Sequence, residues 1–135
     1  MSRSAGAERL THLGRQRPAP GEPFVEAGPL VGAAPLNSVL VNLYRDGNDG
    51  VAWHADDEPE LGREPLIVSV SLGASRAFQL RRRDDPSVRR ELDLHHGDVV
   101  VMHGLTQALW LHQVPKTSRH VGQRVNLTFR SIQRR

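Results

Sequence analysis

The sequence predicts an all-β core folded as a double-stranded β-helix, or jelly roll. From Asn37 onward, short runs rich in Val, Leu and Ile alternate with turn signals, a pattern typical of all-β domains. No long amphipathic helix interrupts this pattern. Eight short strands at hairpin spacing favour a double-sheet jelly roll.

The predicted strands are separated by turns of recognisable composition. They cover residues 38–44, 51–55, 66–72, 76–82, 90–94, 98–102, 109–114 and 123–131. "RDGNDG" (45–50) marks the turn between the first two strands. "SLGAS" (71–75) and "HHGD" (95–98) each supply a glycine for the backbone angles of a turn. "RRRDDP" (81–86) is predicted to form an exposed hairpin tip.

The N-terminal part of the chain has a different composition. Residues 1–36 are rich in Gly, Pro, Ala and Arg and show no sustained hydrophobic period, and "RPAPGEP" would break any helix or strand. We therefore expect an irregular or disordered segment here, with a short helix near residues 5–15. The jelly-roll domain is predicted to span residues 37–131, followed by a tail at 132–135.

Composition excludes several classes of protein. The 135 residues suffice for one domain, and the absence of cysteine excludes disulfides, thiolate zinc sites and cysteine nucleophiles. No run of 18 apolar residues occurs, so no membrane span is expected, and the lack of an apolar signal core predicts a cytoplasmic protein. Arginine supplies 17 of the 18 basic residues and the net charge is +3, which favours a polyanionic partner. A general bias toward arginine explains this composition equally well.

The stretch "VAWHADDEPELG" (51–62) contains the first candidate metal ligands. Side chains at positions i and i+2 of a strand share a face, so His54 and Asp56 should project together. An imidazole and a carboxylate are two of the three ligands in the 2-His-1-carboxylate iron site, which leaves open positions for a cosubstrate and dioxygen. The alternative is an exposed strand end, where such a pair is common.

The third ligand has to come from another histidine. The candidates are His95, His96, His103, His112 and His120. His95, His96 and His120 lie in polar, turn-like contexts, and His103 follows the strand "VVVM". His112 lies within the strand pattern "ALWLHQVP" and can face inward from a facing sheet. We therefore expect His112 to complete the site.

Two strands carry polar side chains suited to an anion. They are Asn42 and Tyr44 in "LVNLY", and Arg124, Asn126, Thr128 and Arg130 in "RVNLTFR". Guanidinium groups bind carboxylates in a bidentate way, and Asn and Thr add neutral hydrogen bonds. The alternative is an edge strand with its polar face in water. An iron triad together with a dianion clamp predicts 2-oxoglutarate, whose keto acid end chelates iron while its distal carboxylate needs a cation.

Four ordered motifs also resemble a known family. "NLYRDGNDGVAWHADDEPELG", "IVSVSLGASRAFQLRRR", "GDVVVMHGLTQALWLHQVPK" and "RVNLTFR" together resemble the AlkB family of iron(II) and 2-oxoglutarate-dependent dioxygenases, over roughly residues 36–131. The branch that repairs alkylated DNA and RNA is the most similar.

The resemblance implies roles for individual residues. The implied metal ligands are His54, Asp56 and His112. The implied 2-oxoglutarate contacts are Asn42, Tyr44, Arg124, Asn126 and Arg130, with Arg124 at the distal carboxylate and Arg130 nearer the iron. The implied substrate contacts are Asp57, Glu58 and Arg83. For Arg83, a solvated hairpin tip is the alternative interpretation.

The resemblance further implies oxidative dealkylation of N-alkylated nucleobases in DNA or RNA, with iron(II) as the metal and 2-oxoglutarate and O₂ as cosubstrates. A base inside a duplex would first be flipped out. We expect a monomer with alkylated nucleic acid as its partner and no membrane association.

One departure from the family keeps alternatives open. The family carries a longer upstream region with aromatic residues that stack on the extruded base. Here the only aromatic residue in positions 1–36 is Phe24. The alternatives are a truncated relative that hydroxylates a non-nucleic-acid substrate, and an inactive remnant that binds nucleic acid through arginines.

Trp53 and Trp110 are predicted to pack in the core.

Overall fold

The computed structural model describes residues 24–27 and 36–133, so the helix predicted near residues 5–15 lies outside the described residues. The described strands are β1 (Phe24–Ala27), β2 (Ser38–Tyr44), β3 (Val51–His54), β4 (Ile67–Gly73), β5 (Arg76–Arg82), β6 (Arg89–Leu94), β7 (Val99–His103), β8 (Trp110–Val114) and β9 (Arg124–Arg130). Two short helical turns are η1 (Pro59–Leu61) and α2 (Thr106–Leu109).

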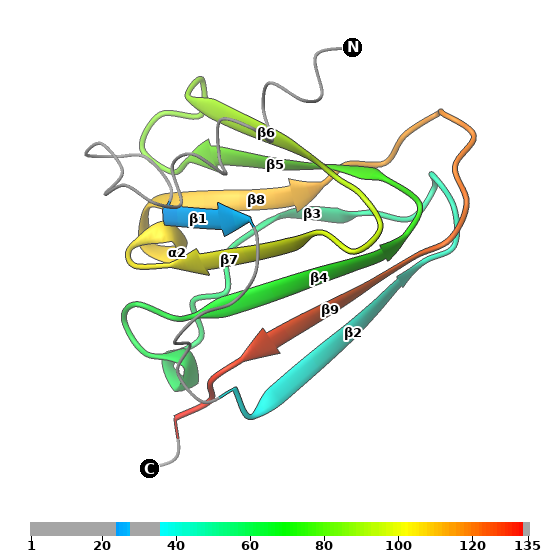
Figure 1. Ribbon diagram of the computed structural model, residues 1–135. Helices are drawn as coiled ribbons and strands as arrows, with labels where there is room; N and C mark the ends of the chain where they lie inside the picture. The colour runs from blue at the N-terminus through cyan, green and yellow to red at the C-terminus, as the bar shows by residue number, and fades with distance from the viewer. Residues whose placement is uncertain (1–23, 28–35, 134–135) are drawn as a thin grey trace.

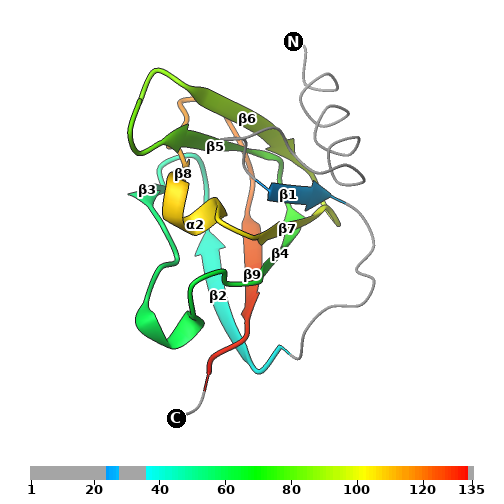
Figure 2. The same cartoon turned by 90° about the vertical axis from the view of Figure 1, so that its left-hand side faces the viewer.

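The strands form two antiparallel sheets that face each other (Figure 1). One sheet has the order β1-β7-β4-β9-β2, and the other has the order β3-β8-β5-β6. Figure 2 shows β5 and β6 above β4, β9 and β2, which makes the two layers visible. The predicted jelly roll is confirmed, and each of the eight predicted strands begins and ends within one residue of its predicted bounds.

The sequence prediction missed strand β1. Phe24–Ala27 lies inside the segment predicted to be irregular, but it pairs antiparallel with β7, with Phe24 opposite His103 and Ala27 opposite Val100. Four residues among prolines and glycines carry little strand signal of their own. Their conformation follows from the ladder that the edge of β7 offers, and no local sequence pattern reveals that ladder.

The core lies between the two sheets. Its most completely buried members include Ile67 on the larger sheet and Leu80 and Trp110 on the smaller one, at 0%, 0% and 1% exposure. These side chains alternate along their strands with outward-facing residues, as the period of a strand requires. Burial of Trp110 confirms its predicted place in the core.

Glycines in two turns have different physical roles. Gly73 in "SLGAS" has φ of 98°, a left-handed conformation that favours glycine, as predicted. Gly47 in "RDGNDG" has no positive φ, but a Cβ built there would lie 2.3 Å from the carbonyl oxygen of Thr117. Glycine is therefore needed at Gly47 because another backbone segment approaches closely.

The outer face of β2 is apolar and open. Val39, Val41 and Leu43 alternate along this strand at 51%, 58% and 54% exposure.

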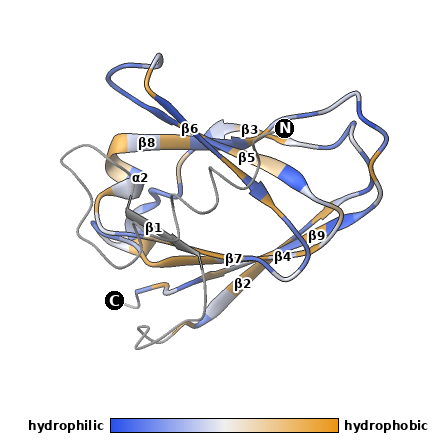
Figure 3. Cartoon of the chain, turned by 45° about the horizontal axis from the view of Figure 1, so that its top comes forward, coloured by the Kyte–Doolittle hydropathy of each residue, from blue (hydrophilic) through white to orange (hydrophobic). Residues whose placement is uncertain are grey.

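Figure 3 shows hydrophobic residues along the central strands β7 and β4 and hydrophilic residues in the loop between β5 and β6. Among the described residues, no helix is long and apolar enough to cross a membrane.

Candidate metal centre and cosubstrate pocket

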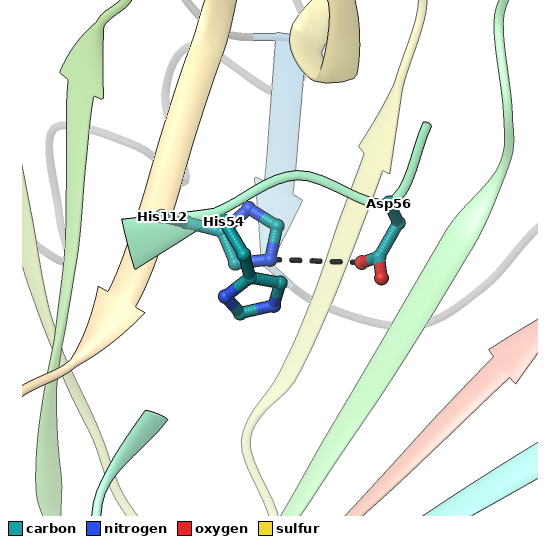
Figure 4. A group of neighbouring side chains, drawn as sticks. All are labelled: His54, Asp56 and His112. Atoms are coloured by element: carbon teal, nitrogen blue, oxygen red, sulfur yellow. Dashed lines mark ion pairs between the residues drawn. The ribbon is translucent and has the colours of Figure 1, made fainter. Parts of the chain in front are cut away.

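Three potential metal ligands come from two neighbouring strands and the segment after one of them. His54 ends β3, Asp56 follows two residues later, and His112 lies in β8. One ligand atom from each residue lies within 4.8 Å of the other two. Figure 4 shows the three side chains gathered together, with a dashed line from His112 Nε2 to Asp56 Oδ2, 3.6 Å apart.

His112 reaches the site from a different direction than predicted. It was expected to face inward from the opposite sheet, but β8 pairs with β3 in the same sheet, and His54 and His112 are register partners. Their ring centroids lie 4.3 Å apart. Directly opposed residues on one face of an antiparallel pair come this close by geometry alone.

Asp56 is placed by contacts outside its own strand. β3 ends at His54, so the alternation of a strand does not extend to Asp56. Instead, the backbone N–H of Asp56 donates to Gln107 Oε1 at 2.8 Å. Arg130 Nη2 donates to Asp56 Oδ1 at 2.8 Å and forms an ion pair with it. The backbone of Asp56 is thus held from α2 and its carboxylate from β9.

The protonation of the three residues suits metal binding. His54 Nδ1 lies 2.8 Å from the carbonyl oxygen of Ala52, which can only accept, so Nδ1 donates its proton there and Nε2 is the ring nitrogen left to face a metal. Burial lowers the pKa of His112 more than the neighbouring Asp56 raises it, so this imidazole is neutral at neutral pH. Burial alone would raise the pKa of Asp56, but His112 and Arg130 outweigh it and hold the pKa below its ordinary value.

A pocket opens beside these ligands, between the two sheets. Its walls include the inward faces of β2 and β9, where the predicted anion contacts lie. They are Asn42, Tyr44, Arg124, Asn126, Thr128 and Arg130, and all of them line the pocket together with His54, Asp56 and His112. The face of β9 that was predicted to be functional is therefore turned inward rather than toward bulk water.

Arg124 is the most deeply buried cation of this pocket, at 1% exposure. Its Nη2 donates to Ser71 Oγ at 2.8 Å, whereas Nε and Nη1 have no hydrogen-bond partner among the described residues. A buried guanidinium with two unpaired donors is costly unless an anion completes it. Asn126 also lines the pocket, and its side-chain oxygen accepts from Ser69 Oγ at 2.7 Å.

These residues fit an iron ion and a dicarboxylate. Two imidazoles and one ionised carboxylate make the donor set of the 2-His-1-carboxylate iron site. The unpaired nitrogens of Arg124 supply the cation that a distal carboxylate needs, and Tyr44 adds a hydroxyl in the same pocket.

The three predicted substrate contacts are exposed and do not line the pocket. Arg83 Nη2 donates to Asp57 Oδ2 at 3.0 Å and to the backbone carbonyl of Gln107 at 2.9 Å. Glu58 is exposed, and its Oε1 lies 3.9 Å from Arg130 Nη1. Arg83 is thus anchored to the segment that carries Asp56, but it lies in the exposed loop between β5 and β6, so its role as a substrate contact stays a prediction.

The prediction that Trp53 packs in the core is wrong. Trp53 lies on the outer face of the smaller sheet and is half-buried. The guanidinium of Arg81 stacks 4.4 Å from the centre of its ring, and that of Arg89 lies 5.6 Å from it. Cations over an indole face account for this half-burial.

The sequence interpretation overlooked two buried polar residues. Gln107, at 1% exposure, fixes the backbone of Asp56 from α2. Arg76, at 4% exposure, lies in β5 beneath the turn after β2. Neither has a local signal that separates it from surface residues of the same type, because each partner is distant in sequence.

Comparison with known proteins identifies the family. The 2OG-Fe(II) oxygenase superfamily matches residues 5–130, a range that includes all three potential ligands and every polar residue of the pocket wall. The chain belongs to this superfamily. Its name gives the metal, iron(II), and the cosubstrate, 2-oxoglutarate, with O₂ as the oxidant.

Within this superfamily the chain is AlkB-like. It is 47% identical over 105 residues to human "Alpha-ketoglutarate-dependent dioxygenase alkB homolog 3". The aligned region covers 72% of this chain and 37% of that protein. It is 41% identical over 119 residues to Arabidopsis thaliana "DNA oxidative demethylase ALKBH2", covering 72% of this chain and 38% of that protein. The chain thus spans well under half the length of these curated relatives.

A solved structure gives the same fold. "The structure of OsALKBH1" matches with a TM-score of 0.60 and 26% sequence identity, covering 98% of this chain and 60% of that chain. This similarity agrees with the two antiparallel sheets of this 2OG-Fe(II) oxygenase.

Proposed function

We propose that this protein is an iron(II) and 2-oxoglutarate-dependent dioxygenase that removes alkyl groups from nitrogen atoms of nucleobases in DNA or RNA. One observation carries the proposal: three potential ligand atoms lie within 4.8 Å of one another in a pocket that also holds the unpaired nitrogens of Arg124. A metal triad and a buried cation in one pocket suit a cosubstrate that needs both.

In this proposal each pocket residue has a defined task. His54, Asp56 and His112 hold iron(II), and Arg130 keeps Asp56 ionised and oriented. Arg124 pairs with the distal carboxylate of 2-oxoglutarate, with Tyr44, Asn42 and Asn126 as neutral neighbours. When bound, iron(II) supplies the redox chemistry that couples decarboxylation of 2-oxoglutarate by O₂ to hydroxylation of the alkyl carbon.

The chain contributes binding, orientation and exclusion of water. Val51, Phe78 and Met102 form apolar walls of the pocket, which limit the access of water to the reacting groups. The proton on His54 Nδ1 stays with the Ala52 carbonyl and fixes the tautomer that a metal requires. Hydroxylation at a carbon attached to nitrogen gives a product that breaks down to the free base and an aldehyde.

The choice of nucleic acid as substrate is supported by the relatives and by charge. The Arabidopsis relative is named a DNA oxidative demethylase. This chain carries a net charge of +3, and Arg81 and Arg89 lie on the outer face of the smaller sheet. Arginines on the outer face of the protein can contact phosphates of a bound nucleic acid. Asp57, Glu58 and Arg83 are proposed to face the base. The cytoplasmic location and monomeric state expected from the sequence stay predictions.

The experiment measures succinate and formaldehyde with and without added iron(II), using methylated and unmethylated DNA and RNA oligonucleotides. Equal amounts of both products that require iron(II) and the methylated oligonucleotide are expected. Succinate formation that is the same with and without every oligonucleotide would favour a dioxygenase that hydroxylates a substrate other than nucleic acid. Binding of oligonucleotides without any succinate would favour the inactive remnant.

A further inference from the structure

Arg76 is a buried charge that pairs with backbone instead of with a carboxylate. Its side chain lies at the start of β5 and is 4% exposed. The guanidinium donates to the carbonyl oxygens of Asp46, Asp49 and Pro115 at 3.2, 2.7 and 2.8 Å. Burying a charge costs free energy, and an apolar residue would fill the space at lower cost if only packing mattered.

These three carbonyls belong to two segments that meet at one end of the pocket. Asp46 and Asp49 lie in the turn between β2 and β3, and Pro115 directly follows β8. The segments touch elsewhere as well, because the backbone N–H of Thr117 donates to the carbonyl of Gly47 at 2.9 Å. Arg76 therefore joins the end of the strand that carries the pocket tyrosine to the end of the strand that carries His112.

Tyr44 connects this junction to the cosubstrate pocket. It is the last residue of β2, directly before the turn that Arg76 holds, and it is 3% exposed. The guanidinium carbons of Arg76 and Arg124 lie 5.5 and 5.0 Å from the centre of its ring. Burial raises the pKa of Tyr44 more than Arg124 lowers it, so the hydroxyl stays protonated and can donate to an anion.

We propose that Arg76 is a positioning residue of the 2-oxoglutarate pocket, which acts through Tyr44 by fixing the turn after β2 so that Tyr44 stands beside Arg124 before the cosubstrate enters. The inference rests on the proposed role of Arg124 as the anchor of the distal carboxylate. Arg76 contributes preorganisation, and binding is tighter when the site does not have to order itself. A lysine keeps the charge but lacks the planar fork that reaches several carbonyls at once.

The test is calorimetric titration of 2-oxoglutarate into protein loaded with Mn(II) in the absence of O₂, so it reads binding without turnover. The variants are Arg76→Gln, Arg76→Lys, Tyr44→Phe and the double variant Arg76→Gln/Tyr44→Phe. Arg82→Gln is the matched control, because Arg82 lies on the same strand but its guanidinium binds Asp84 at 2.7 Å, away from the pocket.

We expect Arg76→Gln and Arg76→Lys to raise the Kd for 2-oxoglutarate about 10-fold or more. This is the lower end of the loss in affinity seen when a residue that orients the direct ligands of a site is removed. Affinity for Mn(II) alone should change less than about 2-fold, because Arg76 does not contact the ligand triad. In the Tyr44→Phe background, Arg76→Gln should add less than about 2-fold, since residues that act through one another are not additive. Arg82→Gln should match the wild type.

Three outcomes would overturn the proposal. Unchanged Kd in both Arg76 variants would remove the residue from the pocket, and additive effects with Tyr44→Phe would show that it acts by another route. Failure of both Arg76 variants to fold, judged by circular dichroism, would make it a residue of general stability. If the wild type itself binds Mn(II) but no 2-oxoglutarate, the proposed function fails instead, which separates the two claims.

Discussion

Two arginines each pair with an aspartate of the same motif, but in different surroundings. Arg130 Nη2 lies 2.8 Å from Asp56 Oδ1, with side-chain exposures of 18% and 7%. Arg83 Nη2 lies 3.0 Å from Asp57 Oδ2, with exposures of 37% and 57%. The variants Arg130→Met and Arg83→Met therefore compare the loss of a buried ion pair with the loss of an exposed one at nearly equal distance.

The expected losses of stability differ because of burial. Removing one partner of a buried pair leaves an uncompensated charge and costs about 3–5 kcal/mol, and the partial exposure of Arg130 places its loss near the lower limit, about 3 kcal/mol. An exposed pair contributes about 1 kcal/mol or less. Urea unfolding of the metal-free protein at pH 7 measures the loss of unfolding free energy in each variant. The slope of that free energy against urea concentration, the m-value, is expected to stay unchanged.

Metal binding provides the second arm of this experiment. A divalent cation bound to Asp56 compensates the carboxylate that Arg130→Met leaves alone, so added Mn(II) should restore more stability to Arg130→Met than to Arg83→Met. Losses of equal size in the two variants, or the same gain from Mn(II) in both, would refute the idea that Arg130 maintains the buried charge of Asp56.

Further predictions concern the ligands, the clamp and pH. His112→Ala should abolish specific Mn(II) binding in calorimetry, while His103→Ala should leave it intact; equal loss would make His112 the wrong third ligand. Arg124→Ala should raise the apparent KM for 2-oxoglutarate by about 10-fold or more, because it removes a charge-assisted pair, and an unchanged KM would remove Arg124 from the clamp. Gln107→Met should weaken Mn(II) binding about 10-fold, since Gln107 fixes the Asp56 backbone; unchanged affinity would limit Gln107 to packing. Burial lowers the pKa of His112, so below about pH 6.5 the unfolded chain takes up a proton that the folded chain does not. The free energy of unfolding of the metal-free protein should therefore decrease as the pH is lowered below about 6.5, by up to about 1.4 kcal/mol per pH unit. His112→Gln should remove this contribution, and an identical pH profile in the variant would contradict it.

The sequence predicted the strands and the polar inner face of β9 because both depend on local rules. Alternation along a strand places Arg124, Asn126 and Arg130 on one face whatever the rest of the fold does. The same rule does not place Trp53, because Val51 and His54 both line the pocket and the pairing of β3 with β8 shifts register between them. The outward position of Trp53 follows from this irregularity, which no local pattern in the sequence reveals.

Other features depend on contacts that no local pattern reveals. Asp56 lies beyond the end of β3 and is held by Gln107 and Arg130, which are 51 and 74 residues away along the chain. Arg76 likewise reaches carbonyls up to 39 residues distant. Side chains with such partners have ordinary surface types in the sequence, so their burial follows only from the packed fold.

The central claim is that His54, Asp56 and His112 bind one metal ion beside an anion site at Arg124. A crystal structure of the protein with Mn(II) and 2-oxoglutarate, with the metal located by anomalous diffraction, tests it most directly. We predict a single strong metal peak bounded by these three side chains, with the distal carboxylate of 2-oxoglutarate on the Arg124 guanidinium. A metal peak elsewhere, or a carboxylate that leaves Arg124 unpaired, would contradict it.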